Sequence, residues 1–201
     1  MENVTVRPVR ADDAAEIAAI YRPHVENTAI TFEYEAPDAR EIGRRIANTV
    51  PKYPYIVAEK DGKILGYAYA HGFRERAAYM YSVETSIYVA ADSHGCGIGA
   101  LLYDDLEKLL RGQGFLNMNA CITVAAKDSE CDPHITDGSV RFHEKLGFAL
   151  VGRFQKCGYK FGRWYDMIWM EKFIGKHTET QSPVIDFCDI KSDLGAEFFA
   201  E

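Results

Sequence analysis

The sequence lacks a long hydrophobic run. No apolar stretch approaches the roughly 20 residues that a membrane-spanning helix needs, and the N-terminus shows no signal-peptide core. It also lacks an excess of basic residues, because 23 Lys and Arg stand against 30 Asp and Glu, for a formal net charge of -7. A nucleic-acid or anionic-membrane partner needs concentrated positive charge. We therefore expect a cytoplasmic protein with no nucleic-acid or membrane partner.

Paired cysteines are also missing. The five cysteines are odd in number, scattered and without C-x-x-C spacing, which excludes a disulfide framework and a zinc site and indicates reduced thiols. The loop that contains Asp128, Glu130, Asp132 and His134 is the place where acidic residues alternate. Such loops are usually solvated, so we expect no metal.

What is present is enough apolar material for one core. With 201 residues and 47% hydrophobic content, the chain is most simply a single folded domain. We place this domain at residues 1–175. Residues 176–201 form an acidic C-terminal extension that retains apolar residues at Val184–Phe187 and Phe198–Phe199. The extension either docks on a surface or is disordered.

Alternation and turn residues predict strands at the following ranges: Val4–Arg10, Tyr55–Ala58, Lys63–His71, Val83–Val89, Leu116–Val124, Phe148–Phe154 and Tyr165–Lys172. Helices are predicted after the cap Ala11–Asp13, closed or kinked by Pro23, then from Asp38 to about Asn48, after Gly99, and over Ser139–Leu146. The polar and β-branched segment Asn27–Tyr34 either lines a pocket or forms an edge. The pattern indicates an α+β domain with a mostly antiparallel sheet.

A glycine-rich loop, Gly95–Gly99, joins the strand that ends at Val89 to an apolar helical pattern. Unpaired amides and the dipole at a helix N-terminus bind anions, and glycines allow a phosphate to approach closely. Ala100-Leu101 follows where a P-loop needs Lys and Ser or Thr, and a dinucleotide-binding fold fits poorly. A structural turn without a ligand is the alternative.

The loop His94-Gly95-Cys96-Gly97-Ile98-Gly99 resembles the Q/R-x-x-G-x-G/A pyrophosphate loop of the GNAT acetyltransferase superfamily, with His94 in place of Gln or Arg. A second family pattern, N-x-x-A-x-x-x-Y-x-x-x-G-F, falls on Thr136, Ser139, His143, Gly147 and Phe148. Its glycine and phenylalanine match, whereas Thr136 and His143 depart from it. The order of predicted elements over residues 3–173 is also similar to that of the superfamily.

Five separated segments closely resemble the phosphinothricin N-acetyltransferase group: Thr31–Glu33, Phe73–Tyr79, Val83–Val89, Phe142–Phe148 and Gly158–Trp164. The resemblance implies a GNAT fold, a mixed and mostly antiparallel central sheet flanked by helices. It also implies acetyl-CoA as cosubstrate and a small amino-acid-like amine as acceptor, such as phosphinothricin or methionine sulfoximine. Relatives of this kind often form homodimers, so we expect one here.

The resemblance further implies a cofactor site made of Ile87, Tyr88, Val89, His94, Gly95, Cys96, Gly97, Ile98, Gly99, Ala100, Thr136 and Ser139. Backbone amides do most of the binding in such a loop. A backbone N–H near Val89 is the expected donor to the oxyanion that forms during acyl transfer.

Acetyl transfer to an amine requires removal of a proton, because amines are protonated at neutral pH. Glu84, at the start of the strand that leads into the loop, is the candidate base, and a solvated strand-edge glutamate is the alternative. Glu33 is a weaker carboxylate candidate that rather shapes the pocket. His143 either protonates the leaving thiolate or has a structural or coenzyme-binding role.

Arg74 and Arg76 are candidates to bind a substrate carboxylate or phosphinate, with surface solvation as the alternative. Phe32, Glu33 and Tyr79 are expected to complete the substrate site. Two other functions stay open: a peptide Nα-acetyltransferase, and an acyl-CoA sensor without catalytic activity.

Overall fold

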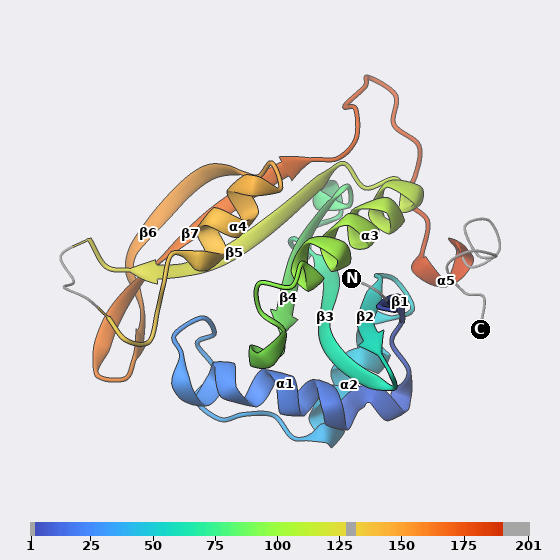
Figure 1. Ribbon diagram of the computed structural model, residues 1–201. Coiled ribbons are helices and arrows are strands. Elements are labelled where there is room, and N and C mark those ends of the chain that lie inside the picture. Colours follow the sequence, from blue (N-terminus) through green and yellow to red (C-terminus); the bar gives the residue numbers. More distant parts are fainter. Residues whose placement is uncertain (1–2, 128–131, 191–201) are drawn as a thin grey trace.

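The computed structural model describes residues 3–127 and 132–190, which form a twisted sheet with helices on both faces (Figure 1). Within these residues the sheet has seven strands in the order β1-β2-β3-β4-β5-β7-β6. The strands are β1 (Thr5–Pro8), β2 (Tyr55–Lys60), β3 (Lys63–Gly72), β4 (Ser82–Val89), β5 (Asn117–Ala125), β6 (Ala149–Lys160) and β7 (Arg163–Phe173). All neighbours pair antiparallel except β4 and β5, which are parallel. The expected α+β architecture is confirmed.

The helices divide between the two faces. They are α1 (Ala14–Asn27), α2 (Ala39–Thr49), α3 (Ile98–Gln113), α4 (Gly138–Lys145) and the short α5 (Phe187–Ile190). One buried cluster joins α1 and α2 to β2 and β3, and the other joins α3 to the central strands. Because Tyr103 of α3 contacts Phe142 and His143 of α4, these two helices share a face.

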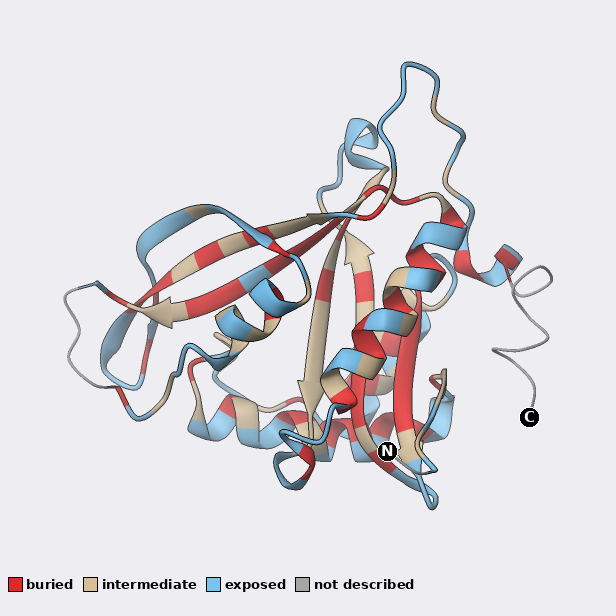
Figure 2. Cartoon of the chain, turned by 45° about the horizontal axis from the view of Figure 1, so that its top comes forward, coloured by how far each residue is buried: buried red, intermediate tan, exposed pale blue. Residues whose placement is uncertain are grey.

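Helix α3 shows how the sequence pattern places the helix against the sheet. Leu102, Leu106, Leu109 and Leu110 recur at helical spacing, and each is at most 1% exposed. The buried stripe of α3 therefore faces the sheet while its other side is exposed (Figure 2). This packing fixes the N-terminus of α3, and with it the glycine-rich loop, next to the end of β4.

The structure decides four local expectations. Pro23 lies inside α1, so of the two alternatives, closing or kinking the helix, closing is excluded. Asp13 is the N-cap of α1, as expected, but its carboxylate accepts hydrogen bonds from the Arg7 guanidinium and the Arg10 N–H and not from the helix. Residues 28–38 contain no strand, and Ile30 lines a pocket, which favours the pocket alternative for this segment. The strand predicted to end at Phe154 continues as β6 to Lys160, through an irregularity in its pairing with β7.

The sheet divides between β4 and β5. Their parallel pairing covers only three residue pairs, from Ser82 with Asn117 to Glu84 with Asn119. Beyond these pairs, β4 continues along β3 as far as Val89, whereas β5 follows β7 to Ala125. Each strand follows its antiparallel neighbour, so the two halves of the sheet separate and leave a gap.

The described part of the C-terminal extension packs on the body of the protein. Phe187 is 2% exposed and belongs to the buried cluster around α3. Gln113 at the end of α3 donates hydrogen bonds to the carbonyls of Lys52 (2.8 Å) and Ile185 (2.7 Å), and the Phe187 N–H also donates to Lys52. Residues 198–199 lie outside the described residues. The division into residues 1–175 and 176–201 stays a prediction.

Candidate active site

The glycine-rich loop presents unpaired amides at the N-terminus of α3. Gly95 and Gly97 have φ angles of 76° and 81°, a region that favours glycine, and Gly97 is the N-cap. The first intrahelical bond runs from the Leu101 N–H to the Gly97 carbonyl. The amides of Ile98, Gly99 and Ala100 precede it and are available to an anion.

The loop is tied to β4 and to α4. His94 donates from Nε2 to the Val89 carbonyl at 2.9 Å, because a carbonyl can only accept. A Cβ at Gly99 would lie 3.1 Å from the Phe142 ring and 3.6 Å from Ile87. Because Gly99 has no side chain, the start of α3 can lie close to both α4 and β4. His94, Gly95, Cys96 and Gly97 are exposed.

A narrow cavity of about 60 Å³, the splay cavity, lies where β4 and β5 separate. Its lining comes from both strands, from α3 and α4, and from the segment after α1: Ile30, Thr85, Ser86, Ile87, Tyr88, Tyr103, Ala120, Cys121, Ile122, Thr123, Ser139 and His143. The structure thus brings Ile87, Tyr88, Ser139 and His143 of the predicted site together.

The edge of β4 that faces this gap carries free backbone groups. The Ala90 N–H donates to Leu65, and the Phe73 N–H donates to Ser82. Hydrogen-bonded pairs alternate along an antiparallel ladder. The N–H groups of Ile87 and Val89, beyond the last pair of β4 with β5, therefore point away from β3, toward the gap.

Side chains alternate along a strand, so Glu84 lies on the face of β4 opposite to Thr85 and α3. There its carboxylate is 3.9 Å from Nε2 of His71 on β3. It lines a hollow of about 820 Å³, the Glu84 hollow, made by Tyr53, His71, Gly72, Phe73, Arg74, Glu75, Arg76, Tyr79 and Glu84. Glu84 directly precedes Thr85, which lines the splay cavity. Burial and, next, the charge of Glu84 raise the pKa of the Cys121 thiol in that cavity to about 12.

Three predicted substrate-binding residues share this hollow. Arg74 stacks over the rings of Phe73 and Trp169, 4.4 and 5.1 Å from their centroids. Arg76 is exposed, and Tyr79 is 43% exposed. The hollow therefore combines cationic and aromatic groups with one carboxylate that faces His71.

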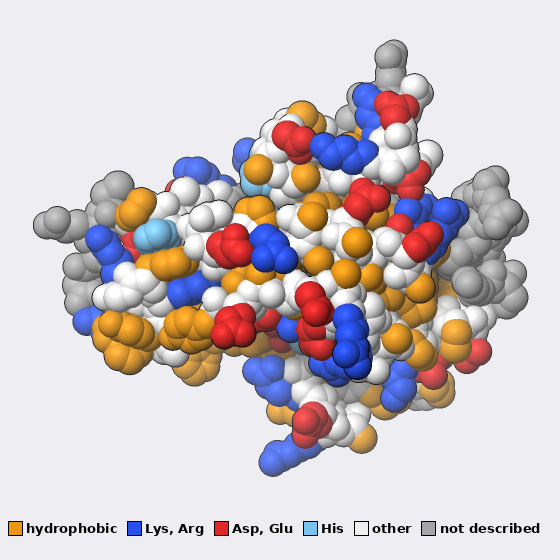
Figure 3. Space-filling model, turned by 90° about the horizontal axis from the view of Figure 1, so that it is seen from below, with side chains coloured by type: hydrophobic (Ala, Val, Ile, Leu, Met, Phe, Trp, Pro, Cys, Tyr) orange, Lys and Arg blue, Asp and Glu red, His pale blue; other side chains and the backbone are white. Residues whose placement is uncertain are grey.

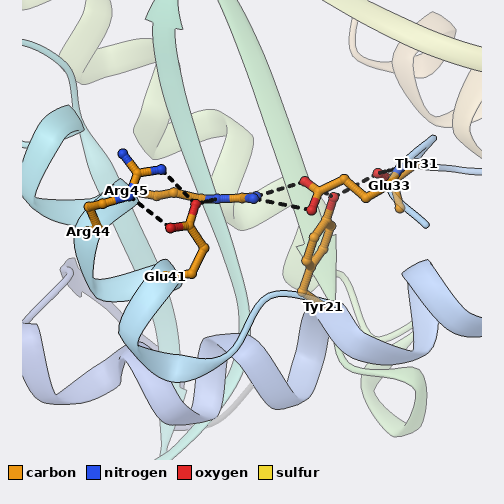
Figure 4. A network of polar contacts seen from close by, with 6 residues as sticks. All are labelled: Tyr21, Thr31, Glu33, Glu41, Arg44 and Arg45. Atoms are coloured by element: carbon orange, nitrogen blue, oxygen red, sulfur yellow. Dashed lines mark hydrogen bonds and ion pairs between the residues drawn. The ribbon is translucent and has the colours of Figure 1, made fainter. Parts of the chain in front are cut away.

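Glu33 belongs to a network that ties the segment after α1 to α2 (Figure 4). Arg45 donates to both carboxylate oxygens of Glu33, at 2.8 and 3.2 Å, and to Glu41 at 2.9 Å. The Tyr21 hydroxyl contacts Glu33 at 3.2 Å and the Thr31 hydroxyl at 2.7 Å. With its oxygens engaged in this way, Glu33 is arranged to hold the segment in place.

His143 is 3% exposed and part of a buried chain of hydrogen bonds. Its Nδ1 lies 2.7 Å from the Ser139 carbonyl and must donate, so the neutral ring accepts at Nε2 from the Tyr103 hydroxyl at 3.1 Å. Tyr103 lies 3.3 Å from the Thr85 hydroxyl. Burial lowers the pKa of His143, which favours this neutral form.

Two predicted positions lie apart from these groups. Thr136 is exposed ahead of α4, where its hydroxyl accepts from the Gly138 N–H. Asp128 and Glu130 lie outside the described residues, whereas Asp132 is buried and accepts from the His134 N–H. Among the described residues, no three His, Cys, Asp or Glu side chains are grouped to hold a metal ion. None of the described helices combines the length and apolar character that crossing a bilayer takes.

A family model described as an acetyltransferase (GNAT) domain matches residues 6–169. The chain is 37% identical to the phosphinothricin N-acetyltransferase of Alcaligenes faecalis over 169 residues, which cover 84% of this chain and 81% of the relative. It is 30% identical to an L-methionine sulfoximine/L-methionine sulfone acetyltransferase of Salmonella typhimurium, over 87% of this chain and 96% of the relative. The chain belongs to the GNAT acetyltransferase family.

A solved structure extends the comparison. The GNAT superfamily phosphinothricin acetyltransferase of Sinorhizobium meliloti, crystallised in complex with AcCoA, is 34% identical with a TM-score of 0.79, over 92% of this chain and 98% of that one. The expected GNAT fold, phosphinothricin acetyltransferase-like group, acetyl-CoA cosubstrate and N-acetyltransferase activity are confirmed. The roles of individual residues stay predictions.

Sequence reasoning missed four residues of this GNAT site: His71, Arg45, Tyr103 and Cys121. His71 can be recognised as a neighbour of Glu84 only from the pairing of β3 with β4, which places the two residues opposite each other. Arg45 follows Glu41 at i,i+4 and resembles an ordinary surface pair. Tyr103 and Cys121 lie in stretches whose apolar pattern indicates only burial.

The loop geometry gives a first prediction. Replacing Gly97 with valine places a β-branched residue at positive φ, at a strain of about 1 to 3 kcal/mol. If the loop relaxes to avoid that strain, acetyl-CoA binding weakens by roughly 5- to 150-fold, which titration calorimetry would measure. Gly62→Val is the matched control, because Gly62 has a φ of 76° in the β2–β3 turn, away from the site. Equal acetyl-CoA affinity in both variants would contradict a binding role for the loop.

Proposed function

We propose that this chain transfers the acetyl group of acetyl-CoA to the primary amine of a small amino-acid-like substrate, of the phosphinothricin or methionine sulfoximine type. The observation that carries this proposal is the place of Glu84. Its side chain lines the Glu84 hollow, and the next residue of β4, Thr85, lines the splay cavity. A base at this position can take the proton from an amine in the hollow as that amine attacks an acyl group in the gap.

The residues present fit acetyl-CoA. The amides of Ile98, Gly99 and Ala100 can bind its diphosphate, and the glycines at positive φ leave room for it. The free edge of β4, at Ile87 and Val89, offers hydrogen-bonding groups to an amide-containing chain laid in the gap. Acetyl-CoA supplies an acetyl group activated as a thioester.

In this proposal Glu84 removes the proton from the amine, directly or through a water molecule. An N–H group on the free edge of β4, such as that of Val89, donates to the acyl oxygen as negative charge develops there. One such donor is worth about 2.7 to 4 kcal/mol in comparable sites.

The leaving thiolate needs a proton, and His143 remains our candidate donor. In the free protein its Nε2 carries no proton and accepts from Tyr103. The hydroxyl of Tyr103 therefore lies between His143 and Thr85, and a proton from His143 would require a change in this chain of hydrogen bonds. The lowered pKa of His143 opposes its protonation.

Direct attack in a ternary complex is favoured by the protonation of the thiol that lines the splay cavity. Cys121 lines the splay cavity, but its pKa is raised to about 12. A protonated thiol is a poor nucleophile, so an acetylated Cys121 intermediate is disfavoured.

The acceptor's own charges match the hollow. Arg74 and Arg76 can bind a carboxylate or phosphinate, and the aromatic ring of Tyr79 lines the same space. The relatives named for phosphinothricin and methionine sulfoximine support a substrate of this size and charge.

We also propose a homodimer. Strand β6 is an edge of the sheet, and the β6–β7 hairpin exposes large apolar side chains: Leu150, Val151, Phe154, Tyr159, Phe161 and Trp164. Figure 3 shows hydrophobic side chains gathered toward the end of the molecule where Figure 1 places this hairpin. An exposed apolar surface on an edge strand is suited to burial against a second copy. A cytoplasmic location and the lack of nucleic-acid or membrane partners stay predictions.

The test is a panel of amines with acetyl-CoA, followed by detection of the released thiol. We expect release with phosphinothricin or methionine sulfoximine, and initial-rate lines that intersect when both substrates are varied. Release with peptides but not with free amino acids would replace this proposal with a peptide Nα-acetyltransferase. Acetyl-CoA binding without release for any amine would indicate a sensor.

A further inference from the structure

The segment between α1 and α2, residues 28–38, carries Phe32 and Glu33 yet has no strand pairing to hold it. Part of its support is the Glu33–Arg45 network on the α2 side. On the other side it is held by the β6–β7 hairpin, which is about 130 residues away in the sequence.

Lys160, the last residue of β6, supplies three hydrogen bonds on this side. It is 3% exposed, and its ammonium donates to three carbonyls: Val25 (2.7 Å), Thr28 (2.9 Å) and Thr31 (2.8 Å). An ammonium group has three donors, so all of them are used within the protein. Val25 lies in the last turn of α1, where a positive charge is favourable. Lys160 therefore fixes the exit of α1 and the start of the segment together.

Two neighbours of Lys160 extend the contact. The Phe32 ring lies so close to Gly158 that a Cβ there would be 2.2 to 2.7 Å from ring atoms. The Tyr34 hydroxyl donates to the Tyr159 carbonyl. Three consecutive residues of β6 thus contact the segment or the end of α1 before it, and Gly158 leaves the space that Phe32 occupies.

We propose that Lys160 and Gly158 are positioning residues that hold Phe32 at the acceptor site and so set the affinity for the amine. The inference rests on the proposed function and on the prediction, made from the sequence, that Phe32 and Glu33 belong to the substrate site. Neither residue needs to touch the substrate, because each acts through the segment.

The first test is Lys160→Met, which keeps most of the aliphatic stem and removes the three donors. We expect amides of residues 28–34 to exchange hydrogen faster than in the wild type, with the α3 amides unchanged. With the best amine of the panel, its KM rises about tenfold to a hundredfold, because small misplacements near a reacting group are costly. The KM for acetyl-CoA stays the same. Lys176→Met removes an exposed ammonium and serves as the control.

The second test leaves the buried charge in place and decides the question if Lys160→Met does not fold. Gly158→Ala displaces the Phe32 ring, whereas Gly152→Ala on the same strand meets no atom within 4 Å. We expect only Gly158→Ala to raise the KM for the amine.

Two results would overturn the proposal: unchanged exchange over residues 28–34 in Lys160→Met, or a rise in both KM values to the same extent. Hydrogen exchange needs no turnover. If no amine is acetylated, the proposed function fails while the anchoring by Lys160 is still measured.

Discussion

Replacing Glu84 with glutamine is expected to lower kcat for amine acetylation by about a hundredfold to ten-thousandfold, the usual contribution of a positioned base. The amide keeps the shape of the side chain but cannot accept the proton. The KM for acetyl-CoA should hold within about twofold, since the loop amides of α3 are untouched. Steady-state kinetics with both substrates varied would measure the two effects separately.

The pH dependence sharpens this test. An α-amino group titrates near 8, so the fraction already deprotonated grows above that pH and the need for a base declines. The deficit of Glu84→Gln should therefore shrink as the pH rises through that range. Glu75→Gln is the matched control, because Glu75 lines the same hollow. A rate equal to the wild type in Glu84→Gln would remove Glu84 from the mechanism.

Truncation of Phe187 to alanine is expected to lower the free energy of unfolding by about 3 to 5 kcal/mol. The Phe187 side chain is 2% exposed within the cluster that α3 forms with the central strands, so its removal leaves a cavity. Urea denaturation followed by circular dichroism would measure the loss.

The control comes from the same segment. Ile185 is 46% exposed, and alanine there retains its backbone hydrogen bonds with Gln113. Ile185→Ala should change the unfolding free energy by no more than about 0.5 kcal/mol. A loss below about 1 kcal/mol in Phe187→Ala would mean that the segment is not part of the cooperative fold.

Local signals predicted much of the framework. The Asp61-Gly62 turn indicated the β2–β3 hairpin, and Asp38 indicated the start of α2, where its carboxylate accepts from the Glu41 N–H at 2.8 Å. The glycines before α3 indicated an anion site because the loop conformation depends on residues next to each other in the chain.

The remaining features depend on partners that are distant in sequence. The separation of β4 from β5 follows from their pairing with β3 and β7, which no local pattern encodes. Lys160 lies beyond the strand predicted to end at Phe154, and its three carbonyl partners come from a distant part of the chain. The irregular pairing of β6 between Phe154 and Gly158 hid the length of that strand.

The division of the sheet also bears on which acyl donors fit. Each half keeps its antiparallel pairing on its own side, and three parallel pairs of β4 with β5 hold the two halves together at one end of the gap. We expect a propionyl or longer acyl group in the gap to meet Ile30 and Ile122, two apolar side chains of the splay cavity.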